Sequence, residues 1–315
     1  MARRHHKTTH TITKPGRFNY NRLVWRLHEG AKKGQYQVVK YFVGQMDANT
    51  RDPITKYTPL HQASIYGHVK IVECLLEYGA EINAPTPADA NCTSLHLAAT
   101  FGHHEVVKVL LQHGAIVNFT PMIQKQTPLH LAAINGHEKV AEVLLKHSKV
   151  KPNDRDENDL TPLHWAAAYG HINVVKQLLL NGANVNMKNN SSWSPLGGKY
   201  NFHEMKQCTP LHLAANNGHF DVILILISFG AELNARNGFN WTPLHQSSRN
   251  GFQEIVKCLI TFGATMDQDL FWARDENCLP LLMKMWSELQ KNNCLSYDFV
   301  YLDSLFSQRN KLIFS

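Results

Sequence analysis

Histidine is the residue type that most suggests chemistry in this chain, because nineteen occur among its 315 residues. Imidazole is a common ligand of zinc and a common general base near neutral pH. Twelve of the nineteen occupy two recurring positions, namely His28, His61, His96, His130, His164, His212 and His245 at one and His68, His103, His137, His171 and His219 at the other. Residues that recur once in each repeated unit serve the fold rather than one metal centre. We therefore expect no resident metal, and His5, His6 and His10 could hold an ion only adventitiously.

Three short stretches superficially resemble catalytic motifs, and each lacks an essential part. Ser191–Ser194 has no glycines that could form a nucleophile elbow. Gly197-Gly198-Lys199 lacks the first half of a phosphate-binding loop, and Tyr200 stands where Ser or Thr would hold Mg²⁺. The acidic stretch Asp154–Glu157 falls in a predicted surface turn. We expect no catalytic residue, no cofactor and no enzyme activity; an enzyme with its site in residues 268–315 is the alternative in this class, and 48 residues are too few for a separate core and site.

A recurring tetrapeptide defines the repeated unit. Thr-Pro-Leu-His begins at Thr58, Thr127, Thr161, Thr209 and Thr242, and a variant with serine in place of proline begins at Thr93. Successive threonines are 35, 34, 34, 48 and 33 residues apart. A period of about 33 residues predicts a solenoid, in which no repeat buries its apolar face without its neighbours. The one long step indicates an insertion loop at residues 187–208, a feature often found on the binding face.

The residues of one repeat predict two short helices. Thr58 is a suitable N-cap, Pro59 suits the first helical position, and His61 stands where a side chain can reach back to the cap. Gly67 suits the left-handed residue that ends the helix. Apolar residues then recur at helical spacing over Val69–Tyr78, which predicts the second helix.

Taken together, Thr-Pro-Leu-His, the small pair Ala-Ala, Gly-His, the Val-Val-Lys helix and Gly-Ala-x-Val-Asn resemble ankyrin repeats. The resemblance covers about residues 23–267, which make about seven repeats. It implies an all-α solenoid of stacked helix pairs with β-hairpin fingers along one edge. We interpret residues 1–22 as a basic, disordered arm and residues 23–50 as a degenerate first repeat. Residues 268–315 are interpreted as a divergent capping repeat with a tail helix.

The charge distribution and the cysteines limit the possible partners and the cellular compartment. The net charge is +7, and residues 1–28 contain seven basic residues and no acidic one, so the remaining chain is neutral. Nucleic acid or anionic lipid could therefore be contacted only through the basic arm. The six cysteines form no Cys-x-x-Cys pair, which favours a reducing intracellular setting, the cytoplasm or the nucleus. The longest apolar run, Val222–Ile227, is too short to span a membrane.

Ankyrin-like modules bind protein partners through their fingers and the concave face of the first helices. Side chains that vary within the constant frame of the repeat are candidates, because the frame does not require them. We predict partner binding at Tyr57, Ile65, Tyr66, Phe101, Ile134, Leu160, Tyr169, Trp193, Phe239 and Trp241. Tyr66, Phe101, Tyr169 and Trp241 are expected to lie on one strip, at equivalent places in successive repeats. The alternative is that some of these side chains pack against the next repeat.

Four asparagines suggest a modification. They follow Ile, Val or Leu and have a leucine eight residues earlier, and they are Asn83, Asn118, Asn186 and Asn234. This pattern is similar to that of ankyrin asparagines hydroxylated by an oxygen-dependent hydroxylase. The structural alternative is that each side chain stabilises a turn by bonding to the backbone.

The sequence thus predicts a monomeric, non-enzymatic scaffold or adaptor whose protein partner is not identified. Two other binding roles stay open. The tail Lys311–Ser315 loosely resembles a secretion tail, which would suit a bacterial effector that acts in the cytoplasm of a eukaryotic host. Leu279-Pro280-Leu281 is a faint sign of the cullin-linking box that a substrate receptor of a ubiquitin ligase would need.

Overall fold

The computed structural model describes residues 17–87, 91–120, 124–190 and 206–266, together with residues 280, 282–284 and 287. In this part of the chain the regular elements are α-helices, and no β-strand occurs. The predicted all-α class is confirmed. Of the predicted sites, Trp193 lies outside the described residues, as do residues 1–16 and most of 268–315.

In the part of the chain that the structure describes, the fourteen helices form seven consecutive pairs. The first helices of the pairs are α1 (Arg17–Lys33), α3 (Pro59–Ile65), α5 (Ser94–Thr100), α7 (Pro128–Asn135), α9 (Pro162–Tyr169), α11 (Pro210–Asn217) and α13 (Pro243–Arg249). The second helices are α2 (Tyr36–Val43), α4 (Val69–Glu77), α6 (His104–Gln112), α8 (Glu138–Leu145), α10 (Ile172–Leu180), α12 (Phe220–Ser228) and α14 (Gln253–Thr261).

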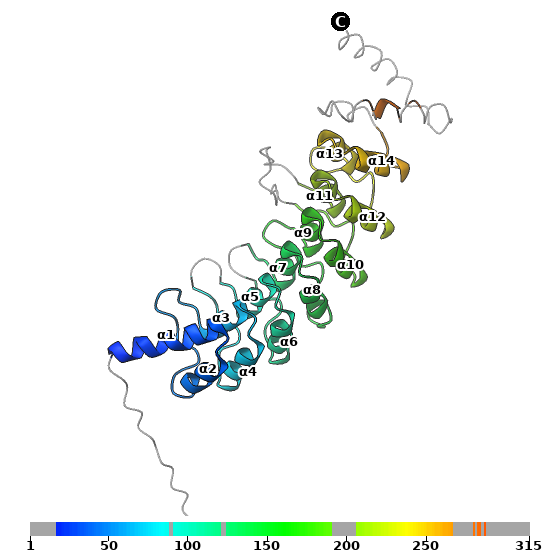
Figure 1. Cartoon of the computed structure of the whole chain (residues 1–315). Coiled ribbons are helices and arrows are strands. Elements are labelled where there is room, and N and C mark those ends of the chain that lie inside the picture. The colour runs from blue at the N-terminus through cyan, green and yellow to red at the C-terminus, as the bar shows by residue number, and fades with distance from the viewer. Residues whose placement is uncertain are drawn as a thin grey trace, which may run out of the picture. The chain divides into compact units, whose positions relative to one another are not determined.

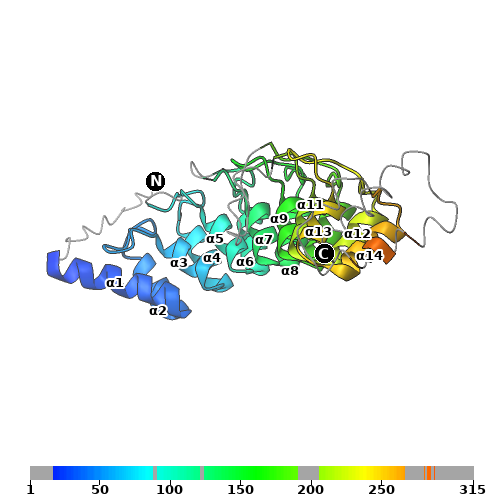
Figure 2. The same cartoon turned by 90° about the horizontal axis from the view of Figure 1, so that it is seen from above.

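The chain divides into two units, residues 1–123 and 124–315. Within the first unit, α1, α3 and α5 contact one another in order, as do α2, α4 and α6. Within the second unit, one row is made by α7, α9, α11 and α13, and the other by α8, α10, α12 and α14. In each unit the loops that precede the first helices project on one side (Figures 1 and 2).

Each unit has its own apolar core between its two rows. The first unit buries Leu27, Leu60, Ile71, Leu75, Leu95 and Leu110, and the second unit buries Leu144, Leu163, Leu178 and Leu211. Small buried residues such as Ala98 and Ala99 on α5 allow neighbouring first helices to approach closely. Because every such residue is buried by the repeat beside it, the stack of repeats forms the core.

The fingers differ from the expected β-hairpins. Where the structure describes every residue of a finger, the finger is a short turn closed by one or two backbone hydrogen bonds, such as those from the Asp52 amide to the Tyr57 carbonyl (2.9 Å) and from the Asn237 amide to the Trp241 carbonyl (2.9 Å). A residue with positive φ precedes the closing residue, for example Lys56 (φ 61°). Such a turn is too short and too tightly curved to extend into a ladder of strands.

Two boundaries can be compared with the sequence interpretation. Helix α1 begins at Arg17, inside the segment that we assigned to a disordered arm. At the insertion, the described ends are joined, because Asn189 donates to the Cys208 carbonyl (3.1 Å) and Gln207 donates to the Asn189 carbonyl (2.7 Å). The base of the finger is therefore closed, and the extra residues come between its two joined ends in the sequence.

Candidate partner-binding surface

The motif histidines join each repeat to the finger that follows. The Thr58 amide donates to His61 Nδ1 (3.0 Å), and His61 Nε2 donates to the Ala84 carbonyl (2.9 Å). One neutral tautomer satisfies both bonds, because Nδ1 must accept and Nε2 must carry the proton. The same pattern links His96 to Phe119, His130 to Leu160, His164 to Cys208 and His212 to Trp241.

Within each unit, histidines after the glycines join one repeat to the repeat before it. His103 Nε2 donates to the Ile65 carbonyl (2.8 Å), and the imidazole covers Gly67. A Cβ on Gly67 would lie 2.5 Å from His103 Nδ1, and this glycine also has a φ of +75°. The glycine is therefore required twice, for its backbone angle and for the ring that packs on it.

Burial keeps four of the motif histidines neutral. It lowers the pKa values of His61, His130, His164 and His212 to about 4, with the bonded carbonyls opposing the shift. A neutral ring with both nitrogens in protein hydrogen bonds has no electron pair left for a metal. Among the residues that the structure describes, no three His, Cys, Asp or Glu side chains are grouped so that they could hold an ion.

Three of the four asparagines make the backbone bonds of the structural alternative. Asn83 Oδ1 accepts from the Ile116 amide (2.9 Å), and Asn234 Oδ1 accepts from the Thr265 amide (2.8 Å). Asn186 accepts from the Glu232 amide and donates to the Gly230 carbonyl. Asn49 makes the same pair of bonds, to Glu81 and Gly79, although the sequence pattern missed it. The pattern missed Asn49 because Ala48 precedes it instead of Ile, Val or Leu. Its place in the repeat was the signal that could have identified it. Hydroxylation of the four, including the exposed Asn118, stays a prediction.

In the first unit, the ends of the first helices present aromatic side chains to solvent. Tyr66 is 44% exposed and Phe101 is 51% exposed. The Tyr66 ring stacks on His68, with 6.4 Å between centroids, and the Lys32 ammonium lies 5.8 Å from the Tyr66 centroid. Tyr57 and Ile65 are half-buried. An accessible aromatic side chain thus lies at the end of each of two successive first helices, α3 and α5.

In the second unit, Tyr169 is the middle ring of a stack. Its ring is 5.9 Å from that of Trp165 and 6.1 Å from that of His171, both nearly parallel to it. Tyr169 and Ile134 are both half-buried. The frame therefore holds Tyr169 more firmly than the sequence suggested.

Phe239 and Trp241 form a second aromatic group, in the finger before α13. Phe239 is exposed, and its ring lies 5.8 Å from that of Trp241. The Arg249 guanidinium lies 5.0 Å from the Trp241 centroid. Trp241 directly precedes Thr242, which is the place that Tyr57 takes in its repeat. The expectation that Trp241 is equivalent to Tyr66, Phe101 and Tyr169 is therefore wrong.

Leu160 is not a contact residue. Its side chain is 0% exposed, its amide donates to Asp156 Oδ1 (3.0 Å), and its carbonyl accepts from His130. The finger folds back here because a buried Trp165 donates its indole N–H to Asp156 Oδ2 (2.8 Å). Sequence reasoning missed this pair, since a tryptophan on a first helix gives no sign of which finger residue it will meet.

A row of amide side chains crosses the first helices of the second unit, and the sequence analysis did not assign it. Asn217 donates to the Ala168 carbonyl (3.0 Å), and Asn250 donates to the Asn216 carbonyl (2.9 Å). Each bond joins one first helix to the next. These half-buried amides present further donors and acceptors beside Tyr169.

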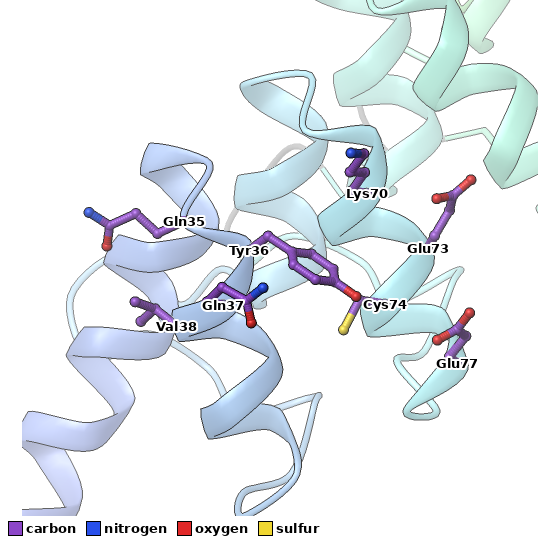
Figure 3. Close-up of a pocket in the computed structure, with 8 residues that line it drawn as sticks. All are labelled: Gln35, Tyr36, Gln37, Val38, Lys70, Glu73, Cys74 and Glu77. Carbon is purple, nitrogen blue, oxygen red and sulfur yellow. The ribbon is translucent and has the colours of Figure 1, made fainter.

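A hollow of about 680 Å³ lies between α2 and α4 in the first unit (Figure 3). Its wall includes Lys70, Glu73 and Glu77, while the Tyr36 ring extends from α2 toward Cys74 on α4. Burial raises the pKa of the Cys74 thiol, which disfavours the thiolate that a nucleophile needs. The hollow is formed by second helices, so it is separate from the aromatic groups at the ends of the first helices.

Comparisons with known proteins agree with this geometry. The family model for ankyrin repeats matches residues 27–121, 118–189 and 195–271, which is well over half of the chain. The crystal structure of the human ASB11 ankyrin repeat domain is similar, with a TM-score of 0.63 and 29% identity. That similarity covers 76% of this chain and 99% of the ASB11 chain.

Curated relatives match over shorter stretches. Human ankyrin repeat and SAM domain-containing protein 3 is 46% identical over 63 residues, and the Arabidopsis thaliana serine/threonine-protein kinase VIK is 34% identical over 62. The alpha-latrocrustotoxin-Lt1a of Latrodectus tredecimguttatus is 43% identical over 53 residues. These stretches are 19%, 20% and 16% of this chain but only 10%, 14% and 4% of the relatives, so the likeness is confined to a small part of each.

The described helices were also compared with the length and apolarity that a bilayer requires. None of them is long and apolar enough to cross a membrane.

Proposed function

Because this chain belongs to the ankyrin-repeat family, we propose that it is a non-enzymatic scaffold or adaptor that binds a protein partner. The binding surface consists of the aromatic groups at the ends of the first helices and in the fingers. Its location is inside the cell, in the cytoplasm or nucleus, in keeping with Cys74, Cys208 and Cys258, which form no disulfide.

The observation that carries the proposal is the exposure of Tyr66 and Phe101 on a frame that does not need them. The capping boxes and the histidines already join each of these repeats to its neighbours, so these rings contribute little to the stack. Aromatic side chains are favoured anchors at protein interfaces. Single exposed apolar side chains are common on any protein, but two at the same place in successive repeats form a continuous surface.

The test uses the full chain and two matched alanine variants. Tyr66→Ala removes an aromatic ring at the end of α3, and Tyr78→Ala removes one at the end of α4, on the other row of the same repeat. The two side chains are 44% and 46% exposed. A partner is first identified by affinity capture and mass spectrometry, and its affinity is then measured by calorimetry.

We expect Tyr66→Ala combined with Phe101→Ala to weaken binding by about 2 kcal/mol or more, the range of interface anchors. Tyr78→Ala should leave the affinity unchanged. Equal effects of Tyr66→Ala and Tyr78→Ala would contradict the assignment of the surface.

The two other binding roles rest on residues 268–315. A ubiquitin-ligase receptor would recruit a second protein through that segment, and an effector would use its tail for export. Deleting residues 268–315 separates these roles from the scaffold: a scaffold keeps its partner, a ligase receptor loses its second protein, and an effector loses its export.

A further inference from the structure

The net positive charge of the chain is concentrated at one end. Nine of its 32 basic residues and one of its 25 acidic residues lie within residues 1–33. The other 282 residues carry 23 basic and 24 acidic side chains, so they are almost neutral. The part of this basic region that the structure describes is α1.

Helix α1 has one buried face and one basic, solvent-exposed face. Val24, Leu27 and Ala31 are buried where α1 packs against α2 and α3. Arg22 and Arg26 are exposed four residues apart, which places them on neighbouring turns about 6 Å apart along the helix. Trp25 is three positions after Arg22, on the neighbouring turn, and is 55% exposed.

The acidic residue on this helix does not neutralise the two arginines. Glu29 pairs with Lys33 at 2.8 Å, and this bond lowers the pKa of Glu29. Among the described residues, no carboxylate lies within 4 Å of Arg22 or Arg26. The exposed side of α1 therefore presents two guanidinium groups that have no acidic partner among the described residues, with the Trp25 indole beside Arg22, three positions along the helix.

We propose that this face of α1 binds single-stranded nucleic acid. Arg22 and Arg26 contact successive phosphates, and a base stacks on Trp25. A positively charged surface with an aromatic platform is the arrangement by which proteins hold single strands without reading their sequence. A lipid surface fits less well, because the apolar stripe of α1 is buried in the repeats and cannot insert.

The site differs from the proposed protein-binding surface, which uses Tyr66 and Phe101 at the ends of α3 and α5. Binding of nucleic acid would therefore be a second activity of the chain. The two proposals can fail separately, since one depends on the exposed aromatic side chains at the ends of α3 and α5 and the other on α1.

The test measures fluorescence anisotropy of labelled oligo-dT and oligo-U, each about 20 nucleotides long, with the full chain. The change is Arg22→Glu with Arg26→Glu, and the control is Lys70→Glu with Lys257→Glu, two exposed lysines of α4 and α14. Both pairs change the net charge equally. We expect the arginine pair to weaken binding about tenfold or more and to lower the salt slope of log K by about 1.4, or 0.7 for each lost contact. The lysine pair should have a much smaller effect.

The aromatic contact has its own variants. Trp25→Ala should weaken binding about tenfold, within the range for one base stacked on an aromatic ring, while Trp25→Tyr should keep most of the affinity. Since all three side chains are exposed, the melting temperature should not change. If the glutamate pair lowers the melting temperature, oligonucleotide binding is measured with Arg22→Gln combined with Arg26→Gln in its place.

Four results would overturn the proposal. The first is an equal loss of affinity in the lysine control, which would indicate only general charge attraction. The second is a duplex of the same length that binds as tightly as the single strand. The third is tighter binding of poly-glutamate than of the oligonucleotides, with the same dependence on Arg22 and Arg26. The fourth is the same outcome with vesicles of phosphatidylcholine and phosphatidylserine.

Discussion

His164 Nε2 lies 3.1 Å from the carbonyl oxygen of Cys208, although the two residues are 44 positions apart. In the preceding repeat, His130 spans 30 positions to reach the Leu160 carbonyl at 3.0 Å. The insertion therefore lengthens the chain between the two repeats without changing the bond that joins them. Contacts between repeats are fixed by the repeat frame, and the loop between them can vary in length.

The bond predicts the effect of removing His164. His164→Ala leaves the buried Thr161 amide without its partner and removes one of two donors to the Cys208 carbonyl, which keeps the Asn189 amide. Loss of that one hydrogen bond costs about 1 kcal/mol. Each buried group left unsatisfied costs about 1–3 kcal/mol. We expect His164→Ala to lower the free energy of unfolding by at least about 2 kcal/mol, as measured by urea denaturation. A loss below about 0.5 kcal/mol would show that water replaces the imidazole.

The N-cap threonines should matter according to their place in the stack. Thr161→Ala removes the cap of α9, which has neighbours on both sides, and should cost about 0.5–2 kcal/mol. Thr242→Ala removes the cap of α13 near the end of the repeats and should leave more of the stack folded. Hydrogen exchange resolved along the sequence is the appropriate measurement. An equal, global loss of protection in both variants would contradict solenoid behaviour.

The neutral histidines predict a loss of stability in mild acid. Burial is the largest cause that lowers the pKa of His61, His130, His164 and His212 to about 4, against about 6.5 for an unfolded chain. Between these values the unfolded chain binds more protons than the folded one. Stability is therefore complete above about pH 6.5 and falls as the pH drops toward 4, by up to about 1.4 kcal/mol per pH unit for each histidine.

Urea midpoints at pH 7.5, 6 and 5 test this expectation. His164→Gln is the control, because it removes one titrating ring and should reduce the slope of stability against pH. A midpoint that does not change between pH 7.5 and 5 would mean that the rings are not desolvated as the structure indicates.

Metal removal gives a simple test of the same rings. Since His61 bonds through both nitrogens to Thr58 and Ala84, a chelator should leave the melting temperature of the repeats unchanged. A fall of many degrees in the presence of a chelator would contradict the structural role of the histidines, because structural metals contribute directly to folding.

The frame of each repeat could be predicted from the sequence because its signals are local. Thr58, Pro59 and His61 form a capping box within four residues, and the structure repeats that box at every motif threonine. Gly67 likewise adopts the left-handed conformation expected of a helix end. Such features depend on residues three or four positions apart, which a sequence displays directly.

Burial of individual candidates could not be predicted in the same way. Leu160 and Trp241 both directly precede a motif threonine, yet the first is buried and the second is half-buried. The difference comes from Trp165, whose bond to Asp156 draws one finger onto its helix. A contact between residues nine positions apart on different elements leaves no periodic signal.

The start of α1 shows a similar limit. A basic sequence without acidic residues is typical of a disordered terminus, but residues 17–22 extend a helix whose later residues Val24 and Leu27 are buried. Packing of the later turns against the repeats stabilises the earlier ones, since adding a residue to an existing helix is easier than starting one. The composition of residues 17–22 does not reveal that the following turns are held by the packing of Val24 and Leu27.

In the second unit we expect Tyr169→Ala with Trp241→Ala to abolish capture of the main partner. Truncation of a buried interface anchor typically costs about 2 kcal/mol or more. The two changes should differ in their effect on folding. Tyr169→Ala breaks the stack with Trp165 and His171, so it should lower stability by about 0.5–1.5 kcal/mol, while Trp241→Ala keeps the backbone carbonyl that accepts from His212.

The matched control is Phe229→Ala with Phe262→Ala, two exposed aromatics at the ends of the second helices α12 and α14. This pair should leave partner binding intact. Because Tyr169→Ala also affects stability, binding is compared at a temperature well below both melting transitions, and Trp241→Ala alone must already weaken it. Normal binding by the Tyr169 and Trp241 variant, together with loss of binding on deletion of residues 268–315, would assign recognition to the C-terminal segment and leave the repeats as a spacer.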